Sequence, residues 1–154
     1  MVKINFVVVG KVKESYYRDA LSEYIKRLSA YAKVVVTEVK EENSPLEQDV
    51  KKTLELEGKS IIEKLKGKVF VLAIEGEKFS SEGFSRLIKS SVDKGEEMTF
   101  VIGSSRGLSD EVKAKADVKI SFSDLTFPHT LMRVILAEQV YRSFTIIAGT
   151  GYHK

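Results

Sequence analysis

The sequence has no cysteine and only two histidines, and both scarcities limit its chemistry. Without cysteine the chain forms no disulfide and offers no thiolate to a metal ion. The two histidines, His129 and His153, are well separated, and no group of His, Asp and Glu residues has the spacing of metal ligands. We therefore expect no metal site.

Long apolar runs are also missing. No stretch approaches the roughly 20 apolar residues that a membrane helix needs. The first residues, MVKINFVVVG, contain one lysine and an apolar run too short for a signal peptide, and they show no cleavage site. These absences favour a cytoplasmic protein that does not enter a membrane.

Neither sign of charge is in large excess. The 25 basic and 22 acidic residues give a net charge of +3, and the signs alternate along the chain. Dedicated nucleic-acid-binding proteins are often far more basic or have a clear basic stripe, so charge alone favours an ordinary solvated surface. The length of 154 residues predicts one domain, spanning residues 1–154.

What the sequence does contain is a regular alternation of strand and helix patterns. The expected strands are Lys3–Gly10, Lys33–Val39, Lys68–Gly76, Met98–Gly103 and Asp117–Ser123. The expected helices are Glu14–Tyr31, Leu46–Lys66 (with Ser44 and Pro45 as N-cap and first residue), Ser80–Gly95 (with serine caps at its start, from Ser80), Leu108–Ala116 (capped by Ser109) and Pro128–Phe144.

This order predicts an α/β protein with an open, mostly parallel sheet and helices on both faces. Near-continuous apolar strands are typical of parallel sheets that are covered on both sides. In such sheets ligands bind at the carboxyl ends of the strands, where the strand order switches. The loops after residues 72–74, 102–103 and 122 are therefore the places where we expect a site.

Two of these loops follow the third and fourth strands. In VIGSSRGL (residues 101–108), Gly103 and Gly107 let the backbone approach a ligand closely. The loop lacks both the Gly-Lys-Ser/Thr of a phosphate-binding loop and the dinucleotide fingerprint, and an ordinary strand-to-helix turn is the alternative. In VLAIEGE (residues 71–77), Glu75 and Glu77 are candidate bases or ribose acceptors, or else solvated turn residues.

The third loop belongs to SFSDLTFPHTLMRVILAEQVYR (residues 121–142), which has unusually few charges for a surface loop. Leu125 and Phe127 offer apolar walls beside several hydroxyls, a mixture typical of small-molecule sites and suited to an adenine. The alternative is a helix N-terminus that packs its apolar residues on the core. His129, in the first turn of that helix, is a candidate for chemistry, although a lone histidine there is more often structural.

The tail GTGYHK (residues 149–154) combines Tyr152 and His153 with a lysine. With Arg142, these aromatic and cationic groups could stack on RNA and neutralise it. A frayed terminus is the alternative interpretation.

These segments, in this order, resemble the RlmH family of ribosomal RNA methyltransferases, which belongs to the SPOUT class. The resemblance covers the whole chain, and the combination of LTFPH, EQVYR and YHK is its most specific part. It implies an α/β fold with a C-terminal deep trefoil knot. It also implies a homodimer that uses S-adenosylmethionine to methylate N3 of a pseudouridine in large-subunit (23S) rRNA, on the assembled ribosome.

The resemblance also implies roles for single residues. Those expected around the cofactor are Leu72, Gly103, Phe122, Ser123, Asp124, Leu125, Thr126 and Phe127. Those expected to hold the target base or to take its proton, without a ranking, are His153, Tyr152, Arg142 and His129. Leu131, Val134, Ile135 and Tyr141 of the last helix are expected to pack on the core or on the partner subunit.

One position departs from the family's pattern. Ser104 stands where relatives commonly have a second glycine, which is costly if the backbone there needs an angle reserved for glycine. The runner-up interpretation is a ribosome- or RNA-binding protein that keeps the fold without binding a cofactor. A third is a flavodoxin-like or other nucleotide-binding α/β protein, and the missing phosphate-cradling loop argues against it.

Overall fold

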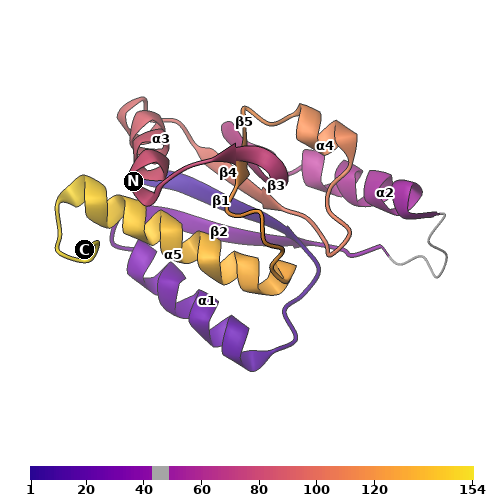
Figure 1. The fold of residues 1–154 in the computed structure, drawn as a ribbon, viewed down its shortest axis with the longest axis horizontal. Helices are drawn as coiled ribbons and strands as arrows, with labels where there is room; N and C mark the ends of the chain where they lie inside the picture. Colours follow the sequence, from indigo (N-terminus) through magenta and orange to yellow (C-terminus); the bar gives the residue numbers. More distant parts are fainter. Residues whose placement is uncertain (43–48) are drawn as a thin grey trace.

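The computed structural model describes residues 1–42 and 49–154, in which five strands alternate with five helices (Figure 1). The strands are β1 (Val2–Val9), β2 (Ala32–Val39), β3 (Lys68–Lys78), β4 (Met98–Ile102) and β5 (Val118–Ser121). The helices are α1 (Ser15–Leu28), α2 (Val50–Ile62), α3 (Ser81–Asp93), α4 (Asp110–Ala114) and α5 (His129–Ala148). The predicted alternation is confirmed, while Ser44, Pro45 and the predicted helix start at Leu46 lie outside the described residues.

The strands form one sheet in the order β2-β1-β4-β3-β5, and the neighbouring pairs are parallel. In this order β2 pairs with one edge of β1. On the other side of β1, β4 lies between β1 and β3, although it follows β3 in the sequence. This confirms the predicted open parallel sheet. Because the strand order switches around β4, the loop that follows β4 lies at a point where open sheets bind ligands.

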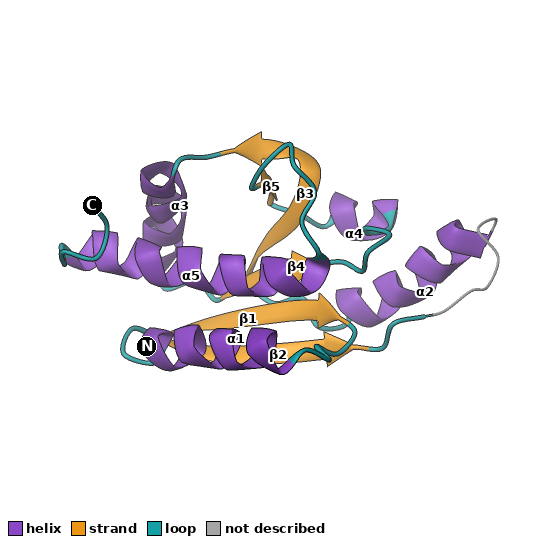
Figure 2. Cartoon of the chain, turned by 60° about the horizontal axis from the view of Figure 1, so that its bottom comes forward, coloured by secondary structure: helices purple, strands orange, loops and turns teal. Residues whose placement is uncertain are grey.

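Helices cover both faces of the sheet, as predicted. On one face Leu28 of α1, Ile88 of α3 and Leu136 of α5 join one buried apolar cluster. On the other face Ile61 of α2 and Val112 of α4 join a second cluster. Figure 2 shows α5 running lengthwise with α1 and α3 on either side of it, while α2 and α4 lie together elsewhere.

A stack of phenylalanines occupies the centre of the first cluster. Phe100 of β4 stacks on Phe70 of β3 with ring centroids 4.7 Å apart, and it meets Phe6 of β1 edge-on at 5.9 Å. All three side chains are at most 2% exposed. Since they come from three adjacent strands, the insertion of β4 between β1 and β3 builds this aromatic core.

The capping residues of α3 and α4 were predicted correctly, whereas the end of α5 was not. Ser80 and Ser109 cap α3 and α4 by accepting backbone N–H groups at 3.0 and 3.2 Å, as predicted. The end of α5 was predicted too early, at Phe144, because the helix continues to Ala148. It ends there because Gly149 adopts the left-handed conformation, with φ of 72°.

The most deeply buried apolar side chains of α5 are not the four that were expected to pack on the core or on the partner subunit. The side chains that pack into the core are Leu136, Ala137, Val140 and Phe144. Leu131, Val134, Ile135 and Tyr141 are half-buried, and of these Tyr141 packs against the core cluster. Apolar side chains occur on several sides of this helix, so their spacing in the sequence did not identify the face that packs on the core.

The trefoil knot and the single-domain organisation remain predictions. In the described part of the chain, no helix has the length and the apolar composition that a membrane span requires.

Replacing Phe100 by alanine should lower the free energy of unfolding by about 3–5 kcal/mol, because it removes the centre of the aromatic stack and leaves a cavity. Denaturation by guanidinium, followed by circular dichroism, measures this loss. Leu56→Ala on α2, where the leucine is 43% exposed, is the matched control and should lose less than about 1 kcal/mol. Equal losses in the two variants would contradict the central position of the stack.

Candidate functional site

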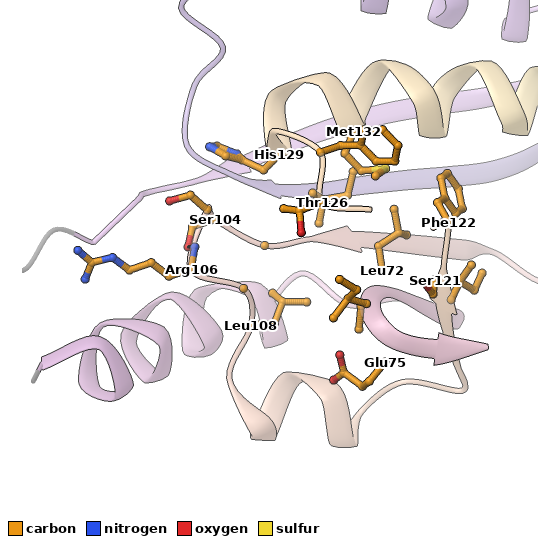
Figure 3. A pocket seen from close by; sticks show the side chains of 18 of the residues that line it. Leu72, Glu75, Ser104, Arg106, Leu108, Ser121, Phe122, Thr126, His129 and Met132 are labelled. Atoms are coloured by element: carbon orange, nitrogen blue, oxygen red, sulfur yellow. Dashed lines mark hydrogen bonds between the residues drawn. The ribbon is translucent and has the colours of Figure 1, made fainter. Parts of the chain in front are cut away.

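The carboxyl ends of β3, β4 and β5 open onto one cavity of about 410 Å³ (Figure 3). Its walls come from residues 72–75 of β3 (beyond the part of this strand that pairs with β4), residues 102–108 at the end of β4 and after it, residues 120–123 at the end of β5 and after it, Thr126 and Phe127, His129 and Met132 of α5, and Lys113 of α4. These walls include the three loops that the sequence analysis selected. The cavity is therefore a consequence of the strand order.

The loop after β4 is a tight turn that only glycine permits at its start. A Cβ atom on Gly103 would lie 2.3 Å from the carbonyl oxygen of Gly107, and Gly107 itself has φ of 93°. The turn is closed by a hydrogen bond from Gly107 N–H to the carbonyl oxygen of Ser104 (2.9 Å). No non-glycine residue in the described chain has a positive φ, so serine at position 104 is tolerated without strain.

The loop after β5 places some of its predicted residues at the cavity and others away from it. Phe122, Ser123, Thr126 and Phe127 line the cavity. Leu125 does not line it and is 71% exposed, although the resemblance implies that it contacts the cofactor. Its backbone N–H donates to the hydroxyl of Ser123 (2.9 Å), so the loop turns and the Leu125 side chain projects to solvent.

Asp124 likewise lies outside the lining of the cavity. Its carboxylate forms an ion pair with Lys78 at the end of β3, and both side chains are exposed. This pair joins the loop after β5 to the end of β3, so Asp124 supports the wall from outside.

On the β3 side, Leu72 and Glu75 line the cavity. The Glu75 carboxylate pairs with Lys113 at 2.7 Å, and the hydrogen bond from this lysine lowers the pKa of Glu75 below its ordinary value. The lowered pKa makes Glu75 a weaker proton acceptor than an ordinary carboxylate, and its pairing with Lys113 occupies the carboxylate. The sequence analysis missed Lys113 and Met132, although Met132 lies three residues after His129 and thus on the same helix face.

A second cavity of about 260 Å³ continues the first along α5. The two share Ile120, Ser121, Phe122 and Phe127. The second is also lined by Phe79 and Phe84, and by Gln139 of α5, whose side chain accepts a hydrogen bond from Ser81 (2.9 Å). The hollow thus extends from the start of α5 toward its middle.

His129 stands where the first cavity meets a groove of about 590 Å³, which Lys11, Lys13, Glu14 and Glu41 also line. Its Nδ1 atom is buried and has no hydrogen-bond partner in the described chain. Burial, and secondly the charge of an arginine one turn further along α5, lowers the pKa of His129 below its ordinary value. The imidazole is therefore neutral at neutral pH.

The other three predicted catalytic residues meet at the opposite end of α5. Arg142 donates to Glu138 at 3.0 Å and contacts His153 Nδ1, also at 3.0 Å. The Tyr152 hydroxyl donates to Glu138 at 3.2 Å. Nε2 of His153 lies 2.8 Å from the carboxylate of Glu82 at the start of α3. The tail is thus part of a polar network, and the sequence analysis missed both carboxylates in it.

The phenol of Tyr152 is unlike an ordinary tyrosine. Burial, followed by the negative charge of Glu138, raises its pKa to about 12. A phenol with this pKa stays protonated at neutral pH and acts as a hydrogen-bond donor. Tyr152 is therefore not the group that accepts the proton.

The two histidines do not meet within one chain. His129 begins α5 and Arg142, which holds His153, comes 13 residues later, a rise of about 20 Å along the helix. Figure 1 shows the C-terminus beside the last part of α5, away from the start of the helix. No three His, Asp or Glu side chains among the described residues could together hold a metal ion.

Comparison with known proteins gives the family. The family profile described as "Predicted SPOUT methyltransferase" matches residues 2–153. A Streptococcus pneumoniae (strain CGSP14) protein named ribosomal RNA large subunit methyltransferase H is 46% identical over 159 aligned residues, covering 99% of this chain and 100% of that protein. The chain belongs to the RlmH family of SPOUT methyltransferases. The resemblance is confirmed, the protein is a methyltransferase, and the non-enzymatic and flavodoxin-like interpretations lose their support.

Solved structures agree with the fold. A methylase family protein from Haemophilus influenzae Rd KW20 aligns with a TM-score of 0.59 at 11% identity, covering 98% of this chain and 70% of that one. One from Neisseria gonorrhoeae aligns with a TM-score of 0.51 at 10% identity, covering 91% and 82%. At these identities the likeness concerns the α/β architecture alone.

The raised pKa of Tyr152 predicts a response to one substitution. Glu138→Gln removes the negative charge that disfavours the phenolate, so the pKa of Tyr152 should fall from about 12 toward 10. Nuclear magnetic resonance of ¹³C-labelled tyrosine, recorded against pH, measures it. Glu23→Gln, which removes an equal charge from α1, is the control and should leave the value unchanged. In the parent, the stabilisation from this group is present below pH 10 and is lost as the pH rises to about 12.

Proposed function

We propose that this methyltransferase uses S-adenosylmethionine to methylate N3 of a pseudouridine in large-subunit (23S) rRNA. It acts on the assembled ribosome in the cytoplasm, as a homodimer of single-domain, knotted chains. The observation that most supports this is the cavity where β3, β4 and β5 end. The full-length identity to a protein named for methylation of large-subunit ribosomal RNA supports the substrate class.

The cavity fits the proposed cofactor in size and in chemistry. Its volume of about 410 Å³ falls in the usual range for small-molecule sites. Leu72, Leu108 and Phe122 offer apolar walls to the adenine, while the hydroxyls of Ser121 and Thr126 suit a ribose. The turn that begins at Gly103 has no side chain there to block a close approach of the ligand to its backbone.

The reaction needs a proton acceptor. When bound, the cofactor supplies an electrophilic methyl group on its sulfonium sulfur. N3 of the pseudouridine holds a proton, and it becomes a good nucleophile only as that proton leaves. The neutral imidazole of His129 at the mouth of the cavity can accept it. Arg142 and His153 can stabilise the negative charge that develops on the base.

The separation of these groups supports the homodimer. Neither Arg142, Tyr152 nor His153 lines the cavity of its own chain. A second copy packed against α5 could bring its own tail to the cavity, and the half-buried apolar residues Leu131, Val134 and Ile135 of α5 offer a surface for that contact. We therefore propose a composite site, with the cavity from one subunit and the tail from the other.

Gly103→Val should abolish binding of S-adenosylmethionine, because the new side chain would collide with the backbone at Gly107. Isothermal titration calorimetry of the purified protein measures the binding. Gly83→Ala on α3, where the added methyl group meets nothing closer than 3.3 Å, is the control and should bind as the parent does.

Circular dichroism shows whether the Gly103→Val variant folds, and Thr126→Val provides a milder change in the same cavity. Undiminished binding by a folded Gly103→Val protein would refute the proposed position of the cofactor. If the parent protein binds the cofactor but methylates no ribosomes, the proposed cofactor site stands and the proposed substrate is refuted.

Mixed dimers test the composite site. Gly103→Val damages the cavity, and His153→Ala damages the tail, so each homodimer should be inactive on unmodified ribosomes. In a mixed dimer one site combines the intact cavity with the intact tail. A random one-to-one mixture should therefore recover about a quarter of the parental rate, since half the dimers are mixed and each has one working site.

No recovery, although mass spectrometry finds mixed dimers, would show that each site is built within one chain. Recovery above one half would show that one of the two variants is not inactive on its own.

A further inference from the structure

Arg133 is a buried charged residue that has no role in the proposed reaction so far. Arg133 lies on the inner face of α5, one turn after His129, and it is 2% exposed. Its guanidinium donates to the carbonyl oxygens of Val9 (2.6 Å) and Gly10 (3.0 Å), where β1 ends. A longer contact of 3.4 Å joins it to Glu38 of β2.

Burying the charge of Arg133 in this way costs free energy that a purely structural role does not require. In the described chain Arg133 forms an ion pair with Glu38 alone, whose side chain is 41% exposed, and the Nε atom of Arg133 has no hydrogen-bond partner there. A buried ion pair can often be replaced by well-packed apolar side chains with no loss of stability. The neighbouring inner positions of α5 are apolar, as Leu136 and Val140 are. A reason for the arginine should therefore be sought in the site.

Arg133 joins the two sides of the groove that lies beside the cavity. The carbonyls that it holds directly precede Lys11, and the loop from Lys11 to Glu14 forms one side of the groove. The first turn of α5, with His129, forms the other. Gly10 is fixed from a second direction, because its N–H donates to the carbonyl oxygen of Val39 (2.8 Å).

We infer that Arg133 is a positioning residue for methyl transfer, which ties the end of β1 to the first turn of α5 and so holds His129 where the cavity and the groove meet. This inference rests on the proposed function, and it names the residue that prepares the site. Arg133 does not line either hollow, so it acts on the reaction through His129.

The charge of Arg133 has a second effect on the same imidazole. A cation one helical turn away disfavours a second positive charge, so it helps to keep His129 neutral. The carboxylates of Glu14 and Glu41 act in the opposite direction, and Lys11 and Lys13 also face the groove. Removing the charge of Arg133 should therefore raise the pKa of His129, while burial continues to lower it.

Two substitutions separate the tie from the charge. Arg133→Met removes both, whereas Arg133→Lys keeps the positive charge but cannot reach both carbonyls and Glu38 together. The pKa of His129 is measured without substrate, by nuclear magnetic resonance of ¹⁵N-labelled histidine against pH. It should rise in Arg133→Met and stay close to the parental value in Arg133→Lys.

The kinetic measurement uses unmodified ribosomes and saturating S-adenosylmethionine. In both variants kcat should fall about tenfold or more, because a misplaced catalytic group costs rate even when it is present. The dissociation constant for S-adenosylmethionine should stay within about twofold of the parental value, since Arg133 does not line the cavity. In Arg133→Met the acidic limb of the kcat profile should also move to higher pH.

Ser143→Ala provides the matched control, because Ser143 is buried on the same helix and lines neither hollow. It should keep the parental kcat and the parental pKa of His129. Parental kcat in both arginine variants would overturn the inference. So would a loss of kcat that merely follows a lowered melting temperature and weakened cofactor binding, because that is what a structural role predicts. If the parent methylates no ribosomes, the proposed function fails, and an unchanged pKa of His129 in Arg133→Met would then also exclude the coupling.

Discussion

The insertion of β4 between β1 and β3 is the constraint on which the rest of the structure depends. All five residues of β4 are buried, and its Phe100 joins the aromatic rings of both neighbouring strands. With β4 in this place, the turn from Gly103 to Gly107 emerges between the carboxyl ends of β1 and β3, and β5 lies on the other side of β3. The cavity forms there because backbone, not side chains, fills the space between Gly103 and Gly107.

The helix α5 connects this cavity to the second cluster of functional groups. At its first turn, burial and a nearby cation keep one imidazole neutral. In its second half, Arg142 joins Glu138 near the helix middle, and together they organise Tyr152 and His153 into a polar network. The same helix packs on α1 and α3. A rigid helix holds the two clusters apart, which is the physical argument for completing the site with a second subunit.

Much of this could be predicted from the sequence, because local signals decide the elements and the chain order decides the type of sheet. The three loops around the cavity follow from the rule for parallel sheets, and Ser80 and Ser109 are caps as expected. Leu125 was assigned from the apolar character of its loop and from the resemblance, yet its side chain is exposed. A turn held by a single serine hydroxyl sets that direction, and composition does not reveal it.

The sequence by itself determined the family, the alternation of strands and helices, and the segments that end at the site. Those features depend on residue types and on short-range spacing, which a single chain displays directly. Only the tertiary structure decided that His129 and His153 lie at opposite ends of α5, that Arg133 is buried against the end of β1, and that Glu138 and Glu82 hold the tail. These contacts join residues from separate elements, and their distances arise from packing, which periodicity in the sequence does not encode.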